Sequence, residues 1–260
     1  MPQLDYLQEM NVGARWCLRR PVGYITPNSP AAATTNASTP VRTEISKSPA
    51  LPSPILPVAD ASQGVSLTTV SKSSWQELQQ LVVECNNCTL SEKRQQAVVG
   101  MGEHNADLLL VGEAPGAEED QQGQPFVGPS GKLLDAMLAS INLNRSKNIY
   151  ITNAVKCRPQ YNRTPSSEEM QTCLPYLQHQ IELLQPSLIV TLGRPAMITL
   201  LQKEISLLSA RGVLHEYQGR PLIVTYHPSY LLRRPIEKRL VWQDLCFIRS
   251  TMLQLGIATT

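Results

Sequence analysis

The feature that most constrains the fold is a regular alternation of short apolar runs and amphipathic segments between residues 106 and 256. The apolar runs are rich in Leu, Ile and Val and are bounded by Gly, Pro or Asn, as buried strands are. The segments between them carry apolar residues at helical spacing. The predicted strands are 106–112, 148–157, 187–193 and 220–229, and the predicted helices are 130–143, 166–184, 194–202 and 236–256.

This alternation predicts an α/β domain, in which a parallel sheet carries helices on both faces. In such sheets ligands bind at the loops that leave the carboxyl ends of the strands. The candidate site is therefore built from four loops, at residues 112–131, 153–165, 192–196 and 226–236.

The N-terminal part of the chain has a different composition. Residues 21–73 are dense in Pro, Ser, Thr and Ala, and their aliphatic residues are isolated. Such a segment cannot bury enough apolar surface to offset its chain entropy. We interpret residues 1–73 as a disordered extension and residues 74–260 as the folded domain. Ser74 followed by Glu77 is a helix-start pattern at this boundary.

Charge and hydropathy exclude several classes of protein. The formal net charge is +2, and residues 1–74 hold six Lys/Arg and four Asp/Glu, so the folded part is neutral. Any affinity for nucleic acid must come from a local patch. No run of about 18 apolar residues is present, so no transmembrane helix and no membrane association are expected. The N-terminus lacks the basic-then-apolar order of a secretory signal, and we expect a cytoplasmic protein with reduced cysteines.

Four of the six cysteines form two pairs, Cys85 with Cys88 and Cys157 with Cys173. Four thiolates suit either tetrahedral zinc or a [4Fe–4S] cluster. A structural zinc site usually has two short C-x2-C hooks, so the wide spacing of the second pair favours the cluster. A thioredoxin-like redox pair is the least favoured interpretation. Cys246 has apolar neighbours in a predicted helix and is expected in the core.

Three residues lie in the loops at the ends of the predicted strands. Phe126 is one of two Phe in the chain, and its ring could stack on a planar ligand or anchor its loop to the core. Asn153 offers both a donor and acceptors, so it could read the edge of a base or cap a turn. His227 precedes a Pro-forced turn, where it could donate a hydrogen bond to a developing anion or play a structural part.

The last loop has an unusual sequence for a solvated segment. Residues 229–235 read SYLLRRP, in which two leucines are followed by Arg233 and Arg234. An apolar wedge inside a phosphate-attracting rim would have this composition. The start of an ordinary helix with surface arginines would have it too.

These loops, read together, resemble the family-4 uracil-DNA glycosylases. The resemblance is carried by residues 112–134 (GEAPGAEEDQQGQPFVGPSGKLL), 151–165 (ITNAVKCRPQYNRTP), 191–196 (TLGRPA) and 225–233 (TYHPSYLLR), and by the cysteine spacings. It covers residues 75–260 and leaves residues 1–74 without a counterpart. It implies a three-layer α/β/α sandwich with a central, mainly parallel four-stranded sheet. It also implies a structural [4Fe–4S] cluster held by Cys85, Cys88, Cys157 and Cys173.

The resemblance implies an activity and a role for particular residues. The activity would be hydrolysis of the N-glycosidic bond of deoxyuridine in DNA, single- or double-stranded, by a cytoplasmic, nucleoid-associated enzyme that acts as a monomer. Phe126 would stack on the extruded uracil, Asn153 would bind its edge, and His227 would stabilise charge on its carbonyl. Leu231 would fill the gap left in the duplex. Gly112, at the end of the first strand, belongs to the same substrate-binding set.

The resemblance leaves the nucleophilic water without its usual carboxylate. Ala114 stands where other members of the superfamily have Asp, and Glu113 and Glu119 are the nearest carboxylates by motif. Gly116 stands where a Tyr blocks the thymine methyl in the best-known members. No basic insertion ending in His precedes the last strand, so turnover is expected. The alternative is a non-catalytic or covalently trapping uracil-DNA-binding protein.

Overall fold

The computed structural model describes residue 70 and residues 73–258. The predicted disorder of residues 1–73 therefore lies almost entirely outside the described residues. Val70 and Ser73 are the exceptions. Val70 is 3% exposed and belongs to a buried apolar cluster. The Ser73 amide donates to the Val70 carbonyl at 3.3 Å, so packed structure begins a few residues before the predicted boundary.

The described residues form one six-stranded sheet in the order β1-β3-β2-β4-β6-β5. The four central strands are parallel to one another, as the alternation predicts. Two short antiparallel strands flank them, β1 beside β3 and β5 beside β6. The prediction omitted these edge strands because strands of two and three residues carry no periodic signal. The strands are β1 (Met101–Gly102), β2 (Leu108–Gly112), β3 (Ile149–Asn153), β4 (Leu188–Leu192), β5 (His215–Tyr217) and β6 (Arg220–Thr225).

The long helices lie where the sequence predicts them. Ser74 and Ser166 begin α3 and α6 with capping boxes, in which each Ser side chain accepts from a Glu amide three residues on. The helices of the described part are α3 (Trp75–Glu84), α4 (Ala117–Gln122), α5 (Pro129–Ala139), α6 (Ser167–Leu184), α7 (Arg194–Leu201), α8 (Leu207–Ala210), α9 (Pro228–Arg233) and α10 (Lys238–Gln254), with 3-10 turns η1 (Thr89–Glu92), η2 (Gln160–Asn162) and η3 (Pro235–Glu237). In that part no helix is long and apolar enough to span a membrane.

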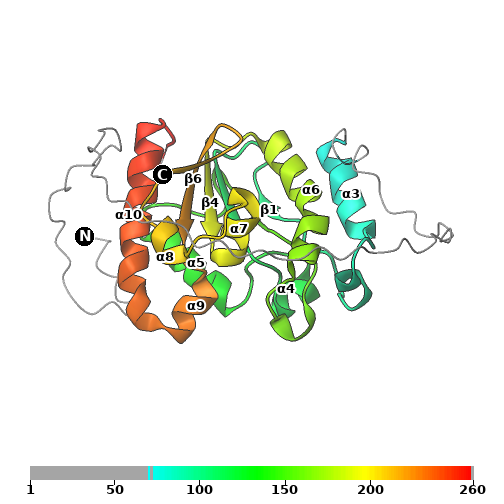
Figure 1. The fold of residues 1–260 in the computed structure, drawn as a ribbon. Helices are drawn as coiled ribbons and strands as arrows, with labels where there is room; N and C mark the ends of the chain where they lie inside the picture. The colour runs from blue at the N-terminus through cyan, green and yellow to red at the C-terminus, as the bar shows by residue number, and fades with distance from the viewer. Residues whose placement is uncertain (1–69, 71–72, 259–260) are drawn as a thin grey trace, which may run out of the picture. The chain divides into compact units, whose positions relative to one another are not determined.

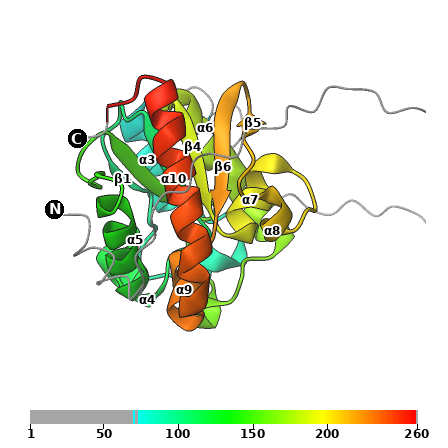
Figure 2. The same ribbon diagram turned by 90° about the vertical axis from the view of Figure 1, so that its left-hand side faces the viewer.

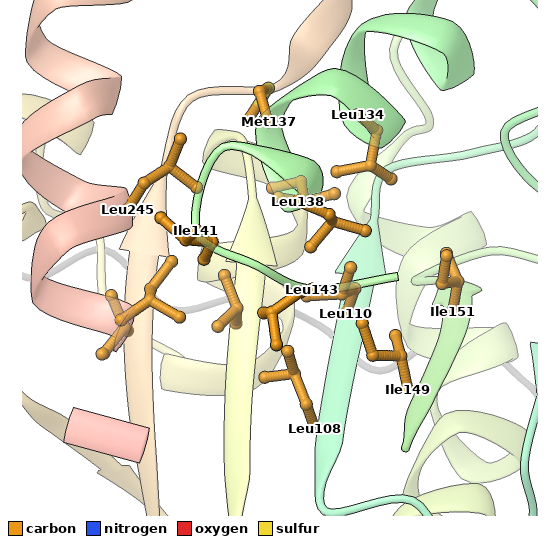
Figure 3. Close-up of a cluster of buried hydrophobic side chains, with 14 of the residues drawn as sticks. Leu108, Leu110, Leu134, Met137, Leu138, Ile141, Leu143, Ile149, Ile151 and Leu245 are labelled. Atoms are coloured by element: carbon orange, nitrogen blue, oxygen red, sulfur yellow. The ribbon is translucent and has the colours of Figure 1, made fainter. Parts of the chain in front are cut away.

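The sheet is covered on both faces, which explains why every residue of β2 is buried. Leu108 and Leu110 face one side, where they pack with apolar residues of α5 and α10. Figure 3 shows this cluster, with Leu134 and Leu245 among its members from the two helices. Figures 1 and 2 show α10 running beside β6 along that face.

The opposite face of the sheet packs against α6 and α7. Leu109 and Val111 of β2 face this side and meet Leu177 and Ile181 of α6 and Met197 of α7. Helix α3 contacts α6 on its outer side. The expected α/β/α sandwich is thus confirmed, with α3 as an addition to one outer layer.

Parallel strands bring their carboxyl ends to one edge of the sheet. Gly112 pairs in register with Asn153, so β2 and β3 end level with each other. Helices α4 and α9 lie at this edge, at the lower end of the sheet in Figure 1. The candidate site residues therefore converge here.

Candidate active site

A cavity of about 390 Å³ opens at the carboxyl ends of the strands. Three of the four predicted loops line it, at 113–130, 153–164 and 227–233. The fourth loop contributes indirectly through Gly193, where an added Cβ would lie 3.0 Å from the His227 Cβ. Phe126, Asn153 and His227, which are far apart in sequence, all contribute to the cavity wall.

Phe126 anchors its loop to the core and also faces the cavity, so its ring stays a candidate for stacking on a ligand. It is 5% exposed, belongs to the apolar cluster of the α5 side, and also lines the cavity. Two glycines make room for it. A Cβ on Gly112 would lie 2.7 Å from the Phe126 ring, and a Cβ on Gly131 would lie 1.8 Å from the Phe126 carbonyl oxygen. The backbone of Phe126 has a φ of 53°, a conformation that is uncommon for a bulky residue. The ring is therefore fixed against the cavity by its surroundings.

Asn153 carries an unpaired polar atom at the cavity. The residue is 1% exposed, and its Oδ1 has no hydrogen-bond partner. A buried polar atom without a partner is costly, because burial removes the water that would otherwise bond it. Gly112 again makes the arrangement possible, since a Cβ there would lie 2.3 Å from this oxygen. An unpaired amide oxygen in a cavity favours ligand binding over the alternative of a turn or cap.

The hydrogen bonds of His227 fix its tautomer. Its Nδ1 accepts from the Ser229 amide at 3.1 Å and lies 2.8 Å from the Ser229 hydroxyl. In the neutral ring the proton must then be on Nε2, which makes Nε2 a donor. The Phe126 and His227 ring centroids are 5.5 Å apart. Burial, aided by the charge of Arg233, lowers the pKa of His227 to about 4, so the ring is neutral near pH 7.

The two candidate carboxylates have different surroundings. Glu113 lines the cavity, and burial raises the pKa of its carboxyl, opposed by the Thr164 hydroxyl and by Arg233. Glu119 also lines the cavity, but its carboxylate accepts from the amides of residues 116, 127 and 128 at 3.1, 3.0 and 3.0 Å. Glu119 therefore holds the glycine-rich loop closed on itself, while Glu113 has the freer carboxylate.

Leu231 lies elsewhere than the sequence led us to expect. It is 1% exposed and belongs to the apolar cluster beneath α9, whereas an inserting side chain must reach out of the surface. Helical geometry turns the next residue outward, and Leu232 is 45% exposed. In this structure Leu232, and not Leu231, is the leucine available to a duplex.

The four paired cysteines meet at a second pocket, between α3, the segment after β3, and α6. Cys157 and Cys173 are buried, and Cys85 and Cys88 are partly exposed. Burial raises the pKa of the Cys173 thiol to about 12. Among the described residues no group of three or more His, Cys, Asp or Glu side chains is gathered closely enough to hold a metal ion. Cys246 lies apart from this pocket, in α10, where it is partly exposed, so the prediction that it lies in the core is wrong.

Two basic residues at the thiol pocket were not predicted from the sequence. Arg94 donates to the Cys157 sulfur at 2.8 Å and to the Cys85 carbonyl at 2.9 Å, so it ties the two pairs together. Lys156 has its side chain fully buried, and its backbone amide donates to the Cys173 sulfur at 3.3 Å. A lysine inside a predicted strand and next to a cysteine was the available clue.

Comparison with known proteins agrees with this geometry. A family model described as the uracil DNA glycosylase superfamily matches residues 99–246. The chain is 42% identical over 180 residues to a type-4 uracil-DNA glycosylase of Pyrobaculum aerophilum, across 65% of this chain and 90% of that protein. It is 40% identical over 189 residues to one of Thermotoga maritima, across 70% and 98%. It is 43% identical over 162 residues to one of Archaeoglobus fulgidus, across 59% and 81%. The chain therefore belongs to the uracil DNA glycosylase superfamily and, within it, to the type-4 family.

Proposed function

We propose that the protein hydrolyses the N-glycosidic bond between uracil and deoxyribose in DNA, releasing uracil and leaving an abasic site for base excision repair. The carrying observation is the unpaired Oδ1 of Asn153, which shares one cavity with a fixed aromatic ring and a neutral histidine donor. The residues that line the cavity come from the described part of one chain, and the enzyme is proposed to act as a monomer. A DNA substrate is consistent with the expected cytoplasmic, nucleoid-associated location.

Uracil is selected at its hydrogen-bonding edge. The Oδ1 of Asn153 accepts from uracil N3–H while its amide nitrogen donates to O4, and Phe126 stacks on the ring. Cytosine has an acceptor at N3 and an amine at C4. The Asn153 oxygen would then face another acceptor, and its amide nitrogen would face another donor. A site built around such hydrogen bonds rejects the mismatched base because its buried polar groups stay unpaired.

Bond cleavage follows from the charges that develop. The C1′–N1 bond breaks with its electron pair going to uracil, and the sugar becomes an oxocarbenium ion. The Nε2–H of neutral His227 donates to the carbonyl oxygen on which the negative charge gathers. Water then adds to C1′ and loses its proton to the surrounding water, from which the released uracil anion takes one up. Glu113 is the carboxylate proposed to orient this water, because Glu119 is already engaged with the loop backbone.

The four cysteines are proposed to hold a [4Fe–4S] cluster. The four thiols are not gathered closely enough in this structure to hold an ion, but their chemistry fits such a group. Four thiols and two basic residues line one pocket, and Arg94 and the Lys156 amide already donate to sulfur. Hydrogen bonds of this kind stabilise thiolate ligands. When bound, the cluster would cross-link α3, the segment after β3 and α6, and take no part in the hydrolysis. Cys157 follows Asn153 by four residues, so this cross-link would brace the segment that reads the base.

The test of the proposed function is uracil release by the purified protein, after its iron content has been measured. Oligonucleotides bearing one uracil, one cytosine or one thymine are compared, in single- and double-stranded form. The expected result is free uracil and an abasic site from the uracil strands alone, with many turnovers per protein. No release by iron-loaded protein would overturn the proposal. A protein–DNA adduct that survives denaturing electrophoresis would favour the trapping alternative.

Replacing Leu232 by Ala is expected to lower uracil release from double-stranded DNA about 10-fold and to leave single-stranded DNA almost unaffected. A duplex needs an apolar side chain to hold the gap open after the base leaves the stack, whereas a single strand does not. Leu231→Ala is the matched variant. Since Leu231 lies in the core, it should lower the free energy of unfolding by about 2–5 kcal/mol. An equal loss on both substrates in Leu232→Ala would contradict the assignment.

A further inference from the structure

Lys156 is a buried charge for which the proposed hydrolysis has no use. Its side chain is 1% exposed, yet the ammonium has a partner for each of its three hydrogens. Its Nζ donates to the Thr152 hydroxyl at 2.6 Å, to the Gln180 Oε1 at 2.6 Å and to the Asn153 carbonyl at 2.8 Å. The last of these partners is the backbone of the residue that reads the base.

The surroundings of Lys156 are arranged to receive a cation. The Thr152 hydroxyl and the Gln180 amide nitrogen both donate to the Val99 carbonyl, at 2.8 and 2.9 Å. These bonds turn the lone pairs of the hydroxyl and of the Gln180 Oε1 toward the ammonium. The network thus orients its acceptors without supplying any negative charge.

No carboxylate among the described residues forms an ion pair with Lys156. A buried ammonium without a counter-ion is expensive, because three neutral acceptors replace hydration only in part. The groups that can provide the missing charge are the sulfurs. Lys156 and all four paired cysteines line the same pocket, and its own amide donates to the Cys173 sulfur.

We propose that Lys156 is a positioning residue that links the thiolate site to the base-reading Asn153. Thiolates that hold a metal centre are the counter-charge that keeps the ammonium buried. The buried ammonium in turn holds the backbone carbonyl of Asn153. It thereby fixes the position of the Asn153 side-chain amide in the cavity. The link from Lys156 to Asn153 rests on the proposed function. The link from Lys156 to the thiolates rests only on the attraction between opposite charges.

The test is a double-mutant cycle around Lys156→Met, which keeps most of the unbranched apolar side chain and removes its charge. With metal content and far-UV circular dichroism unchanged, kcat/KM for uracil release should fall about 10- to 100-fold, as a misplaced binding group would cause. In an Asn153→Ala background the same change should have almost no further effect. In a His227→Ala background, on the other side of the cavity, it should retain its full effect.

A second measurement, the midpoint potential of the metal centre, tests the link between the Lys156 charge and the thiolates without any turnover. Removing a cation beside an iron–sulfur centre destabilises its more negative, reduced state, so Lys156→Met should move the midpoint potential to more negative values. An unchanged potential would overturn the link to the thiolates. Equal losses in both mutant backgrounds would overturn the link to Asn153 and leave only a general effect on the fold.

Two further outcomes are distinguishable. If Lys156→Met does not fold, Lys156→Gln, which keeps an amide donor in the network, enters the same cycle and is judged by the same coupling. If the wild-type protein releases no uracil while the potential still shifts in the Lys156 variant, the proposed function fails and the charge link stands.

Discussion

Replacing His227 by Ala is expected to lower the rate of uracil release about 10²- to 10³-fold, with little change in the affinity for uracil-containing DNA. The loss has this size because one fixed donor to a developing anion contributes that much in comparable sites. The Ser229 amide holds Nδ1 as an acceptor and so directs the proton to Nε2 before substrate arrives. Single-turnover rates and equilibrium binding, measured on the same single-stranded oligonucleotide, separate the two effects.

The pH dependence provides an independent check. Burial lowers the pKa of His227 to about 4, so the ring stays neutral from about pH 8 down to about pH 5. The single-turnover rate should therefore show no inflection from His227 near its ordinary pKa of about 6.5. The unfolded chain binds the proton near that ordinary value and the folded protein binds it only near 4. Acidification through this window therefore favours the unfolded state.

His215→Ala is the matched control for His227. His215 lies on β5, and its Nε2 contacts the Ala210 carbonyl at 2.8 Å, away from the cavity-lining residues. It should keep the wild-type rate. A wild-type rate in His227→Ala would contradict the assigned role. An inflection near pH 6.5 that disappears in His227→Ala would show that the charged ring takes part in the reaction.

The fold was largely predictable because its signals are local and repeated. The five residues of β2 are all buried, and such runs are recognised by composition alone. The capping boxes at Ser74 and Ser166 marked two helix starts within one residue. Strands β1 and β5 escaped prediction because two or three residues form a strand only when a neighbouring strand is already in place.

The site was predictable by residue type and only partly by orientation. Asn153 is the last residue of β3 and His227 follows β6 by two residues, so topology alone brings them to one edge. Leu231 and Leu232 are adjacent residues of the same type, so their sequence does not distinguish them. The helical turn of α9 decides which of them is exposed. Glu119 sits at the cavity, yet three loop amides occupy its carboxylate. Contacts between residues far apart in the chain cannot be predicted from the spacing of residues in the sequence. Lys156 was missed for the same reason, since its partner Gln180 lies 24 residues away.

The proposed cluster predicts that replacing Cys173 by Ser removes bound iron and lowers the melting temperature by roughly 10 °C. Serine has nearly the same volume, so packing is preserved, but its hydroxyl is a poor ligand for iron. Losing a bound metal centre removes several kcal/mol of folding free energy, and each kcal/mol shifts the melting temperature by about 2–4 °C in a domain of this size. Iron content and thermal unfolding are measured first, and uracil release afterwards, at a temperature where the variant is folded.

The order of the effects decides what the cysteines do. Cys173 is buried, its sulfur accepts from the Lys156 amide, and the Lys156 Nζ donates to the Asn153 carbonyl. A structural centre should therefore lose iron first, then stability, and then activity through the displaced Asn153. Cys246→Ser is the matched control, because Cys246 lies in α10 outside the thiol pocket, and it should keep wild-type iron and stability. A Cys173→Ser protein that keeps its iron and its melting temperature but releases no uracil would give the thiol a direct part in the chemistry. Bound zinc in place of iron would mean that the four thiols hold a zinc ion. The cross-link would then remain, and the proposed cluster would be wrong.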